Sequence, residues 1–411
     1  ALVILGLGDA RAVAWRNGLS VSGRLIWQWK DYLDRRWIGM YQKPMRRMDS
    51  DDPMRCGGCG AKVGAEVLAG ALAALPQMPG ADVLVGLDAA DDAAVLLPPA
   101  GQAIVQSVDH FRAFIDDPFL FGQIAAAHAL SDLHAMGARP WSALAIAGVP
   151  YSSGDRMRAD LAAMLLGAAE TLKADGCTLV GGHSAEAAEA ALGFAVTGLA
   201  DPKRLLRKSG LRLGDALVLT KRLGTGVILA GHMRGEAKAA WLAAALDSMR
   251  VSNAAAVQVL RDHGVTACTD VTGFGLAGHL LEMLRASKVA AVLWPDAVPA
   301  LPGAAALAAR GIESTLAPDN RRMLGPLGMQ PDLALLVDPQ TSGGLLAGVP
   351  VEQAEACLAA LHAAGSPAAI VGRVVQPASR TAFPLRLDRS DAKAGQIRSG
   401  QGSIGRRGDP G

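Results

Sequence analysis

Short apolar runs alternate, over most of the chain, with longer segments whose apolar residues recur every three or four positions. Buried strands produce the first pattern and amphipathic helices produce the second. The helical pattern covers residues 64–75, 118–136, 155–174, about 235–263, a segment opening near 275, and 351–364. The short runs predict strands at residues 93–97, 102–108, 143–148, 178–180, 192–198, 216–220, 265–269, 289–293, 333–337 and 345–349. This alternation predicts an α/β (α+β) fold, with helices layered on sheets.

The first 50 residues differ in composition from the rest. They contain four of the seven tryptophans, and nine Lys and Arg residues against four Asp. The residues Ile26, Trp29, Leu33, Trp37 and Met40 recur at helical spacing and predict an amphipathic helix with an apolar stripe. Two interpretations remain open: the helix packs on a domain absent from this sequence, or it lies on a membrane surface. Because the sequence opens on a strand-like apolar run, we expect it to be the rear part of a longer polypeptide.

Polar and basic stretches divide the chain into five parts. We expect a remnant of an N-terminal domain at 1–50, a Gly-rich Cys/Lys segment at 51–90, an N-terminal nucleotide-binding domain at 91–205, and a C-terminal domain at 206–385. The boundary between the last two is the basic connector 202–214. Residues 386–411 are rich in Gly, Ser, Arg and Asp, a composition that predicts a disordered tail.

Composition excludes several classes of protein. The 411 residues carry a net charge of only +2, which leaves no electrostatic footprint for nucleic acid. Five scattered cysteines do not form a disulfide framework, so we expect a reducing, cytoplasmic environment. The sequence has no run of eighteen apolar residues, and no signal peptide is recognised.

The segment Cys56-Gly-Gly-Cys59-Gly-Ala-Lys62 concentrates reactive side chains in a flexible backbone. Its glycines allow a close approach to a ligand. A lysine near a cysteine favours the reactive thiolate and also attracts phosphate. Three readings compete: half of a zinc site, a dithiol redox pair, or a nucleophile loop that faces a phosphate. A zinc site needs a second pair of ligands at short spacing, and the remaining cysteines, Cys177, Cys268 and Cys357, stand apart.

Carboxylates gather near the ends of predicted elements. Asp91 and Asp92 directly precede the strand at 93–97, and Asp109 is expected at the end of the next strand. Adjacent carboxylates repel one another unless a cation is present, and Mg²⁺ prefers oxygen ligands that it shares with phosphates. His128 and Asp132 lie four residues apart and therefore share one face of a helix. A carboxylate on an otherwise apolar helix needs a metal or a donor.

Three small-residue turns complete the set of candidate sites. Gly181-Gly-His-Ser184 follows a predicted strand, where backbone amides and a hydroxyl suit phosphate. The stretch 269–278 matches the dinucleotide pattern G-x-G-x-x-G, but Asp270 at the strand end would repel a bare pyrophosphate. Asp270 is better interpreted as a metal ligand. The third turn is Asp338-Pro-Gln-Thr-Ser-Gly-Gly-Leu-Leu346. Together these residues indicate a nucleotide bound through several Mg²⁺ ions, with a thiol close by.

Six of these stretches, in this order over residues 54–385, resemble the selenophosphate synthetase (selenide, water dikinase) family. They are Gly58-Cys-Gly-Ala-Lys62, Asp91-Asp-Ala-Ala-Val95, Ala129-Leu-Ser-Asp-Leu-His-Ala-Met-Gly137, Gly181-Gly-His-Ser184, Thr269-Asp-Val-Thr-Gly-Phe-Gly-Leu276 and Asp338-Pro-Gln-Thr-Ser-Gly-Gly-Leu-Leu346. The resemblance implies a two-domain fold like that of aminoimidazole ribonucleotide synthetase, in a homodimer built around a β-barrel. It also implies the conversion of ATP, selenide and water into selenophosphate, orthophosphate and AMP.

The resemblance also implies roles for individual residues. Cys59 matches the catalytic cysteine and Lys62 the essential lysine, which also contacts ATP. Mg²⁺ ligands are implied at Asp92, Asp132 and Asp270. Further ATP contacts are implied at Ala89, Ala90, Asp91, Asp109 and Asp132, and at Gly182, His183 and Ser184, which would be supplied across the dimer.

The sequence departs from the family at a few positions. Many members carry a second cysteine where this chain has Ala61, and the extra thiol, Cys56, lies upstream instead. Ala89 replaces a common hydroxyl residue, and His128 replaces a common asparagine. The first 45 residues are similar to the end of an NADH dehydrogenase-like flavoprotein that some members carry as a fusion.

Two rival functions remain open on sequence alone. One is a same-fold ATP-dependent enzyme that acts on a carbon substrate, and the other is a non-catalytic nucleotide-binding redox sensor. The complete Cys/Lys loop favours the synthetase over the first rival, because an enzyme of this fold that acts on a carbon substrate has no need for it.

Overall fold

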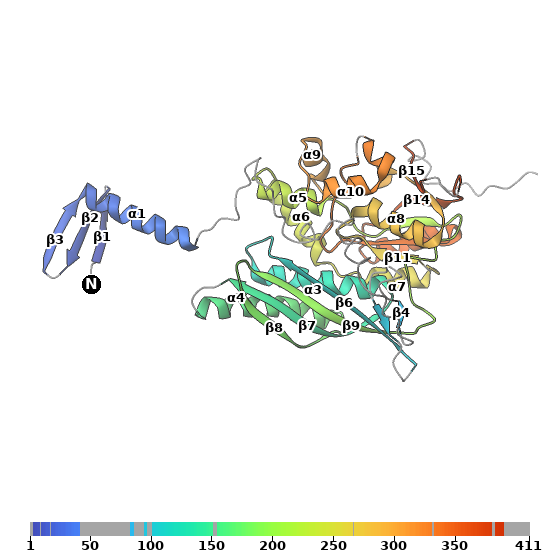
Figure 1. The fold of residues 1–411 in the computed structure, drawn as a ribbon, viewed down its shortest axis with the longest axis horizontal. Coiled ribbons are helices and arrows are strands. Elements are labelled where there is room, and N and C mark those ends of the chain that lie inside the picture. Colours follow the sequence, from blue (N-terminus) through green and yellow to red (C-terminus); the bar gives the residue numbers. More distant parts are fainter. Residues whose placement is uncertain are drawn as a thin grey trace, which may run out of the picture. The chain divides into compact units, whose positions relative to one another are not determined.

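The computed structural model describes residues 3–8, 10–16, 18–41, 83–85, 94–96, 101–150, 154–265, 267–330, 333–379 and 383–389 (Figure 1). These residues fall into two compact units. The first contains three strands and one helix from the N-terminal 52 residues, and the second contains the elements from β4 onward. The candidate chemistry of the described residues lies in the second unit.

The N-terminal unit is a small antiparallel sheet with one helix. The strands β1 (Val3–Gly8), β2 (Arg11–Arg16) and β3 (Leu19–Gly23) pair in sequence order, and α1 (Arg24–Tyr41) follows directly. The helix packs on the sheet, which confirms the predicted helix. Its apolar stripe stays partly open, since Trp29 is 43% exposed and Leu33 is 37% exposed. A surface of this kind is available for a partner or an interface.

The second unit begins with a six-stranded sheet. Its strands are β4 (Val83–Val85), β5 (Ala94–Leu96), β6 (Ala103–Arg112), β7 (Arg139–Pro150), β8 (Thr178–Ala187) and β9 (Ala191–Ala200). They lie in the order β4-β5-β6-β9-β7-β8, and all neighbours are antiparallel except β7 and β8. The helices α3 (Pro118–Ala135) and α4 (Gly154–Ala174) pack on this sheet (Figure 1).

Helix α3 is buried along most of its length because it is packed from several sides. It contacts α4, the strands β6 and β9, and elements of the C-terminal half, including β11 and α7. Two glycines allow α3 and α4 to approach closely. A Cβ on Gly122 would lie 2.0 Å from the carbonyl oxygen of Met164, and one on Gly167 would lie 2.0 Å from that of Phe119. Asp117 starts the helix by accepting a hydrogen bond from the Leu120 amide at 3.0 Å.

The C-terminal half contains a second six-stranded sheet. Its strands are β10 (Ala216–Leu219), β11 (Ala267–Asp270), β12 (Ala290–Leu293), β13 (Leu345–Val349), β14 (Ala369–Val375) and β15 (Leu385–Leu387). Their order is β11-β13-β10-β14-β12-β15, antiparallel except for β12 and β15. Helical segments surround it: α5 (Thr225–Met233), α6 (Ala239–Arg250), α7 (Ala254–Asp262), α8 (Gly275–Ser287), η2 (Pro295–Ala297), α9 (Ala304–Ala309), α10 (Ala317–Met323), η3 (Gly325–Met329) and α11 (Val351–Ala363).

Both faces of this second sheet are covered, which explains why its strands are continuous apolar runs. In β10, Leu217 and Leu219 pack into one core cluster, which includes residues of α8. Ala216 and Val218 pack into another, which includes residues of α7 and α11. The period of two residues in a strand assigns alternate side chains to opposite faces.

Most predicted elements are confirmed, and three predictions are wrong. Residues 333–337 form hydrogen-bonded turns, with the amides of Leu336 and Val337 both bonded to the carbonyl of Leu333, because this apolar run is buried as a packed turn. Asp109 does not end its strand, since β6 continues to Arg112. Residues 181–184 are not a turn, because β8 continues through them to Ala187. The strands β2, β3, β4, β14 and β15 and the helices α5, α9 and α10 were not predicted. The expected helix at 64–75 and the tail lie outside the described residues.

Neither a membrane span nor a disulfide is found in the described part of the chain. None of its helices is long and apolar enough to cross a bilayer. The cysteines Cys177, Cys268 and Cys357 are all buried and form no disulfide. Burial raises the pKa of the Cys177 and Cys357 thiols to about 11, which disfavours the reactive thiolate form.

Candidate active site

Strand β6 and helix α3 bring four polar side chains together. Ser107 donates a hydrogen bond to the Asp132 carboxylate. Two residues further along β6, on the same face of the strand, Asp109 Oδ2 lies 3.5 Å from His128 Nε2. Residues two apart on β6, Ser107 and Asp109, therefore face residues four apart on α3, Asp132 and His128. The prediction that His128 and Asp132 share a face is confirmed, and that face is turned toward β6.

His128 is fixed by contacts on both ring nitrogens. The backbone amide of Ser342 donates to its Nδ1 at 3.0 Å, so this nitrogen carries no proton and the neutral ring holds its proton on Nε2, toward Asp109. The ring of Phe111 packs against the imidazole at 5.2 Å between centroids, nearly perpendicular to it. His128 thereby joins Asp109 to a loop of the C-terminal half.

Ser342 belongs to the predicted turn 338–346 and adopts an unusual backbone conformation. Its φ of +48° lies in the left-handed region, which a residue with a side chain enters only at a cost. The Ser342 amide is bonded to His128, and its carbonyl accepts a hydrogen bond from Lys221 Nζ at 2.9 Å. These two contacts, one from each half of the unit, hold the strained conformation in place.

Lys221 lies two residues after the end of β10 and is buried. Its ammonium donates to the carbonyls of Val251, at 2.5 Å, and Ser342. Burial lowers the pKa of Lys221 to about 7, although the charges of Asp270 and Asp175 oppose this shift. Asp270 ends β11 and is only 2% exposed. Contacts thus run from Lys221 through Ser342 and His128 to Asp109, and the charge of the predicted metal ligand Asp270 acts on Lys221.

The turn 338–346 is also fixed to the start of α5. Gln340 Oε1 accepts hydrogen bonds from the amides of Gly224, at 2.9 Å, and Thr225, at 3.2 Å. Asp338 Oδ2 accepts from the Gly226 amide at 3.1 Å and from Gln340 Nε2 at 2.8 Å. Burial raises the pKa of the Asp338 carboxyl to about 7, more than these hydrogen bonds lower it. This network keeps the turn rigid.

Gly182, His183 and Ser184 lie apart from this group. They are exposed on β8, at one edge of the first sheet, and pair in parallel with β7. Two strands, β9 and β7, separate β8 from β6. At the usual strand spacing, β8 with Ser184 therefore lies about 14 Å from β6 with Asp109. A Cβ on Gly182 would lie 2.1 Å from the carbonyl oxygen of Ala145, so the backbones of β7 and β8 require glycine here.

The remaining predicted site residues lie outside the described residues. They are Cys59, Lys62, Ala89, Ala90, Asp91 and Asp92. Among the residues that the structure does describe, no group of three or more His, Cys, Asp or Glu side chains could hold a metal ion. The implied Mg²⁺ set includes Asp92, which lies outside the described residues. It stays a prediction.

Sequence reasoning missed the polar contacts between the two halves of the unit. His134 Nε2 lies 2.9 Å from Asp175 Oδ2, which also accepts a hydrogen bond from Ser252 at 2.5 Å. Asn253 Nδ2 donates to Ser131 Oγ at 2.9 Å. One signal was available: His128, Ser131 and His134 recur every three residues on the apolar helix α3, and polar residues at this spacing mark a buried polar face.

Comparisons with known proteins identify the class. Residues 90–200 match the N-terminal domain, and residues 212–382 the C-terminal domain, of AIR synthase related proteins. The crystal structure of thiamine-monophosphate kinase from Stenotrophomonas maltophilia K279a has the same fold, with a TM-score of 0.55 at 23% identity over 75% of this chain and 92% of that one. The fold and the site thus define an AIR synthase-related protein of two α/β domains, which confirms the predicted two-domain α/β fold, whereas the homodimer around a β-barrel stays a prediction.

Curated relatives narrow the assignment within this class. A protein of Desulfitobacterium hafniense (strain Y51) named "Selenide, water dikinase" is 42% identical over 340 residues, which cover 80% of this chain and 97% of the relative. A protein of the same name from Myxococcus xanthus (strain DK1622) is 42% identical over 329 residues, 78% of this chain and 92% of the relative. The chain belongs to the selenide, water dikinase family.

Proposed function

We propose that this chain makes selenophosphate from ATP, selenide and water, and releases AMP and orthophosphate. The observation that carries the proposal is the 42% identity over 97% of a relative named selenide, water dikinase. The loop from Cys59 to Lys62 supports it, because a thiol suits a soft selenium anion and a neighbouring ammonium suits phosphate. The product would supply the synthesis of selenoproteins and selenium-modified tRNA.

Mg²⁺ is the cofactor that we propose, with Asp92, Asp132 and Asp270 as its ligands. The donor set fits this ion, since Asp132 and Asp270 offer carboxylate oxygens and Mg²⁺ prefers oxygen ligands. When bound, Mg²⁺ would offset the roughly four negative charges of ATP, which the carboxylates alone would repel. Ser107 would orient Asp132 through its hydrogen bond.

The other residues would bind ATP and position the reacting groups. Proposed ATP contacts are Lys62, Ala89, Ala90, Asp91, Asp109 and Asp132. His128 holds Asp109 at one ring nitrogen while the other accepts the Ser342 amide, so the orientation of this carboxylate depends on both halves of the unit. Lys62 would neutralise negative charge on the transferred γ-phosphoryl group. Cys59 would hold the selenide.

We further propose a homodimer in which Gly182, His183 and Ser184 contact the nucleotide of the partner subunit. The distance from β8 to β6 across the sheet supports this, since the exposed residues of β8 are far from Asp109 in their own chain. An edge strand with unpaired backbone groups is also a natural dimer contact. We also propose a cytoplasmic location for this activity. Residues 1–50 would contact a flavoprotein domain or a membrane surface.

The test is formation of AMP from ATP with and without selenide. The unmodified chain should form AMP only when selenide is present. Cys59→Ala and Lys62→Ala should lose the selenide-dependent activity, while Cys56→Ala, a matched change in the same loop, should keep it. Selenide-independent turnover would favour an enzyme that acts on a carbon substrate, and ATP binding without turnover would favour a redox sensor. Full activity of Cys59→Ala would contradict the assigned role.

A further inference from the structure

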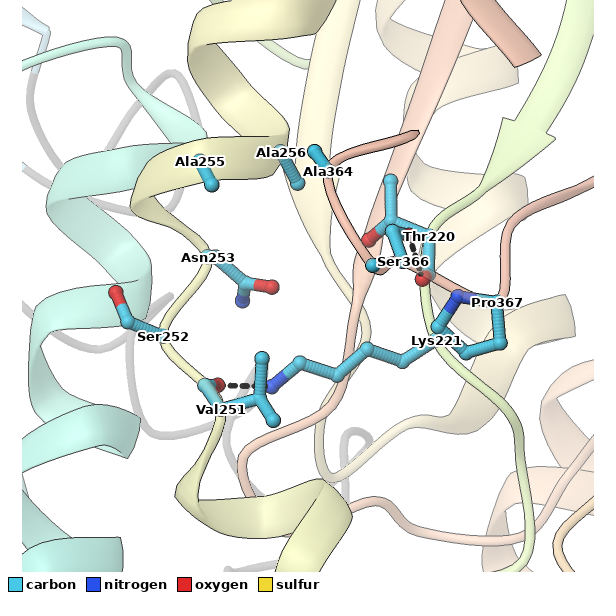
Figure 2. Close-up of a pocket in the computed structure, with 11 residues that line it drawn as sticks. Thr220, Lys221, Val251, Ser252, Asn253, Ala255, Ala256, Ala364, Ser366 and Pro367 are labelled. Atoms are coloured by element: carbon cyan, nitrogen blue, oxygen red, sulfur yellow. Dashed lines mark hydrogen bonds between the residues drawn. The ribbon is translucent and has the colours of Figure 1, made fainter. Parts of the chain in front are cut away.

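Lys221 is a buried lysine to which the proposed reaction assigns no role. Only 5% of the residue is exposed, and Figure 2 shows its side chain extended toward the carbonyl of Val251. Its Nζ donates to this carbonyl, in the loop between α6 and α7, and to that of Ser342, in the turn 338–346. Burial lowers its pKa to about 7, but the uncharged amine also has two N–H bonds, so both contacts are available in either form. A buried amine is costly, which calls for a reason beyond packing.

The bond to Ser342 acts on a residue whose conformation needs support. Ser342 has a φ of +48°, in the left-handed region that a residue with a side chain enters only at a cost. Its side chain gives no support, since Oγ is buried and has no hydrogen-bond partner among the described residues. The conformation is therefore held through the backbone. The carbonyl accepts from Lys221 at 2.9 Å, and the amide donates to His128 Nδ1 at 3.0 Å.

The rest of the turn has anchors of its own. The Thr341 amide donates to Thr225 Oγ1 at 3.0 Å, and the Leu345 amide donates to Thr220 Oγ1 at 2.7 Å. Because these anchors lie on either side of Ser342, loss of the lysine bond should free the backbone of Ser342 without unfolding the turn.

The second contact of the lysine fixes its position relative to helix α3. The loop that contains Val251 is joined to α3 by a hydrogen bond from Asn253 Nδ2 to Ser131 Oγ at 2.9 Å. Helix α3 also carries His128. The lysine and the imidazole that hold Ser342 are therefore both fixed with respect to α3, so its backbone is held between two defined points.

We propose that Lys221 is a positioning residue for the nucleotide site. Its bond to the Ser342 carbonyl orients this backbone so that the amide hydrogen points at His128 Nδ1. With Nδ1 occupied as an acceptor, the neutral imidazole keeps its proton on Nε2, which faces Asp109 Oδ2 at 3.5 Å. Lys221 thereby controls the orientation of the carboxylate that we propose as an ATP contact. This inference rests on the proposed function, because it needs Asp109 to contact ATP.

The first test asks whether Lys221 acts through His128. Lys221→Met keeps the length of the side chain and removes both donors. It should raise the Kd for a non-hydrolysable ATP analogue, measured by calorimetry with Mg²⁺ and without selenide, about fivefold, as His128→Leu should. The double variant should also show about a fivefold effect, because both changes break the same connection. Arg222→Met alters an exposed neighbour and should leave the Kd unchanged.

Two outcomes of this cycle overturn the inference. Independent effects would multiply to about 25-fold in the double variant, which would show that Lys221 does not act through His128. An unchanged Kd in Lys221→Met would show that the lysine has no influence on the nucleotide site.

The second test needs neither nucleotide nor turnover. In nitrogen NMR of the unmodified chain, His128 should show an unprotonated Nδ1 and a protonated Nε2, with its signals assigned by their loss in His128→Asn. Lys221→Met should give a mixture of the two tautomers, and Lys221→Gln, which is too short for both contacts, serves in its place if the methionine variant does not fold. If the unmodified chain binds no ATP analogue, the proposed function and the inference fail together. If it binds the analogue and forms AMP, but the His128 spectrum is the same in both chains, only the inference fails.

Discussion

The buried carboxyl of Asp338 should make the stability of the protein depend on pH in a predictable direction. Burial raises its pKa in the folded protein from 3.8 to about 7. The folded state therefore binds this proton more tightly than the unfolded state does. Its contribution to the free energy of unfolding is fully present below pH 3.8 and is lost as the pH rises to about 7.

The size of the effect follows from the shift. A difference of about three pKa units corresponds to about 4 kcal/mol, at 1.36 kcal/mol per unit, as an upper limit. Asp338→Asn removes the titration but keeps an oxygen that can accept from the Gly226 amide and Gln340 Nε2. Above pH 7 the variant should therefore be more stable than the unmodified chain, and the difference should shrink toward pH 4.

The assay is urea unfolding of both chains, without nucleotide, at intervals from pH 4 to pH 8. Even a quarter of the expected difference, about 1 kcal/mol, shifts a denaturation midpoint measurably. Asp296→Asn, an exposed aspartate in η2, serves as the control and should leave the pH profile unchanged. Parallel profiles for Asp338→Asn and the unmodified chain would refute the reasoning, because they would show that Asp338 does not titrate in this range.

Three further predictions concern the proposed site and the N-terminal unit. Asp270→Asn should abolish Mg²⁺-dependent ATP turnover with an unchanged thermal midpoint. Near-normal turnover at limiting Mg²⁺ would instead favour the interpretation of residues 269–278 as a dinucleotide-binding motif. His128→Leu should raise the KM for ATP about fivefold, because it removes an acceptor worth about 1 kcal/mol from the Ser342 amide. His128→Asn, which retains an acceptor, should restore most of the affinity, and equal defects would contradict the positioning role. A chain that starts at Asp51 should form AMP normally, and a large loss would assign residues 1–50 to the synthetase. Pelleting with anionic vesicles, measured with and without these residues, distinguishes the membrane reading from flavoprotein docking.

The sequence predicted elements well where the period of apolar residues was unambiguous. Helix α3 was found within one residue of its ends, because Asp117 and Pro118 start it and Gly137, with φ of +67°, follows it. The run at 333–337 failed for a physical reason. Five apolar residues fit a strand or a buried turn equally well, and only the packing of Leu333, Leu336 and Val337 into a core cluster decides between them.

The candidate site was predictable only in part, and for a similar reason. His128 and Asp132 could be placed on one face because helical spacing is local. Which groups meet them is not local: the amide bonded to His128 comes from a residue 214 positions away, and the carbonyls bonded to Lys221 come from 30 and 121 positions away. Chemistry-bearing motifs can therefore be read from the chain, whereas their mutual contacts depend on the packing of the two halves.

The same reasoning explains why the burial of Lys221 and Asn253 could not be predicted from the sequence. Lys221 follows an ordinary apolar strand, and Asn253 lies in a short loop between two helices, where polar residues are expected. Each becomes unusual only through tertiary burial, which leaves an ammonium with one N–H bond to spare and an amide oxygen without a donor. Groups of this kind are expensive to bury.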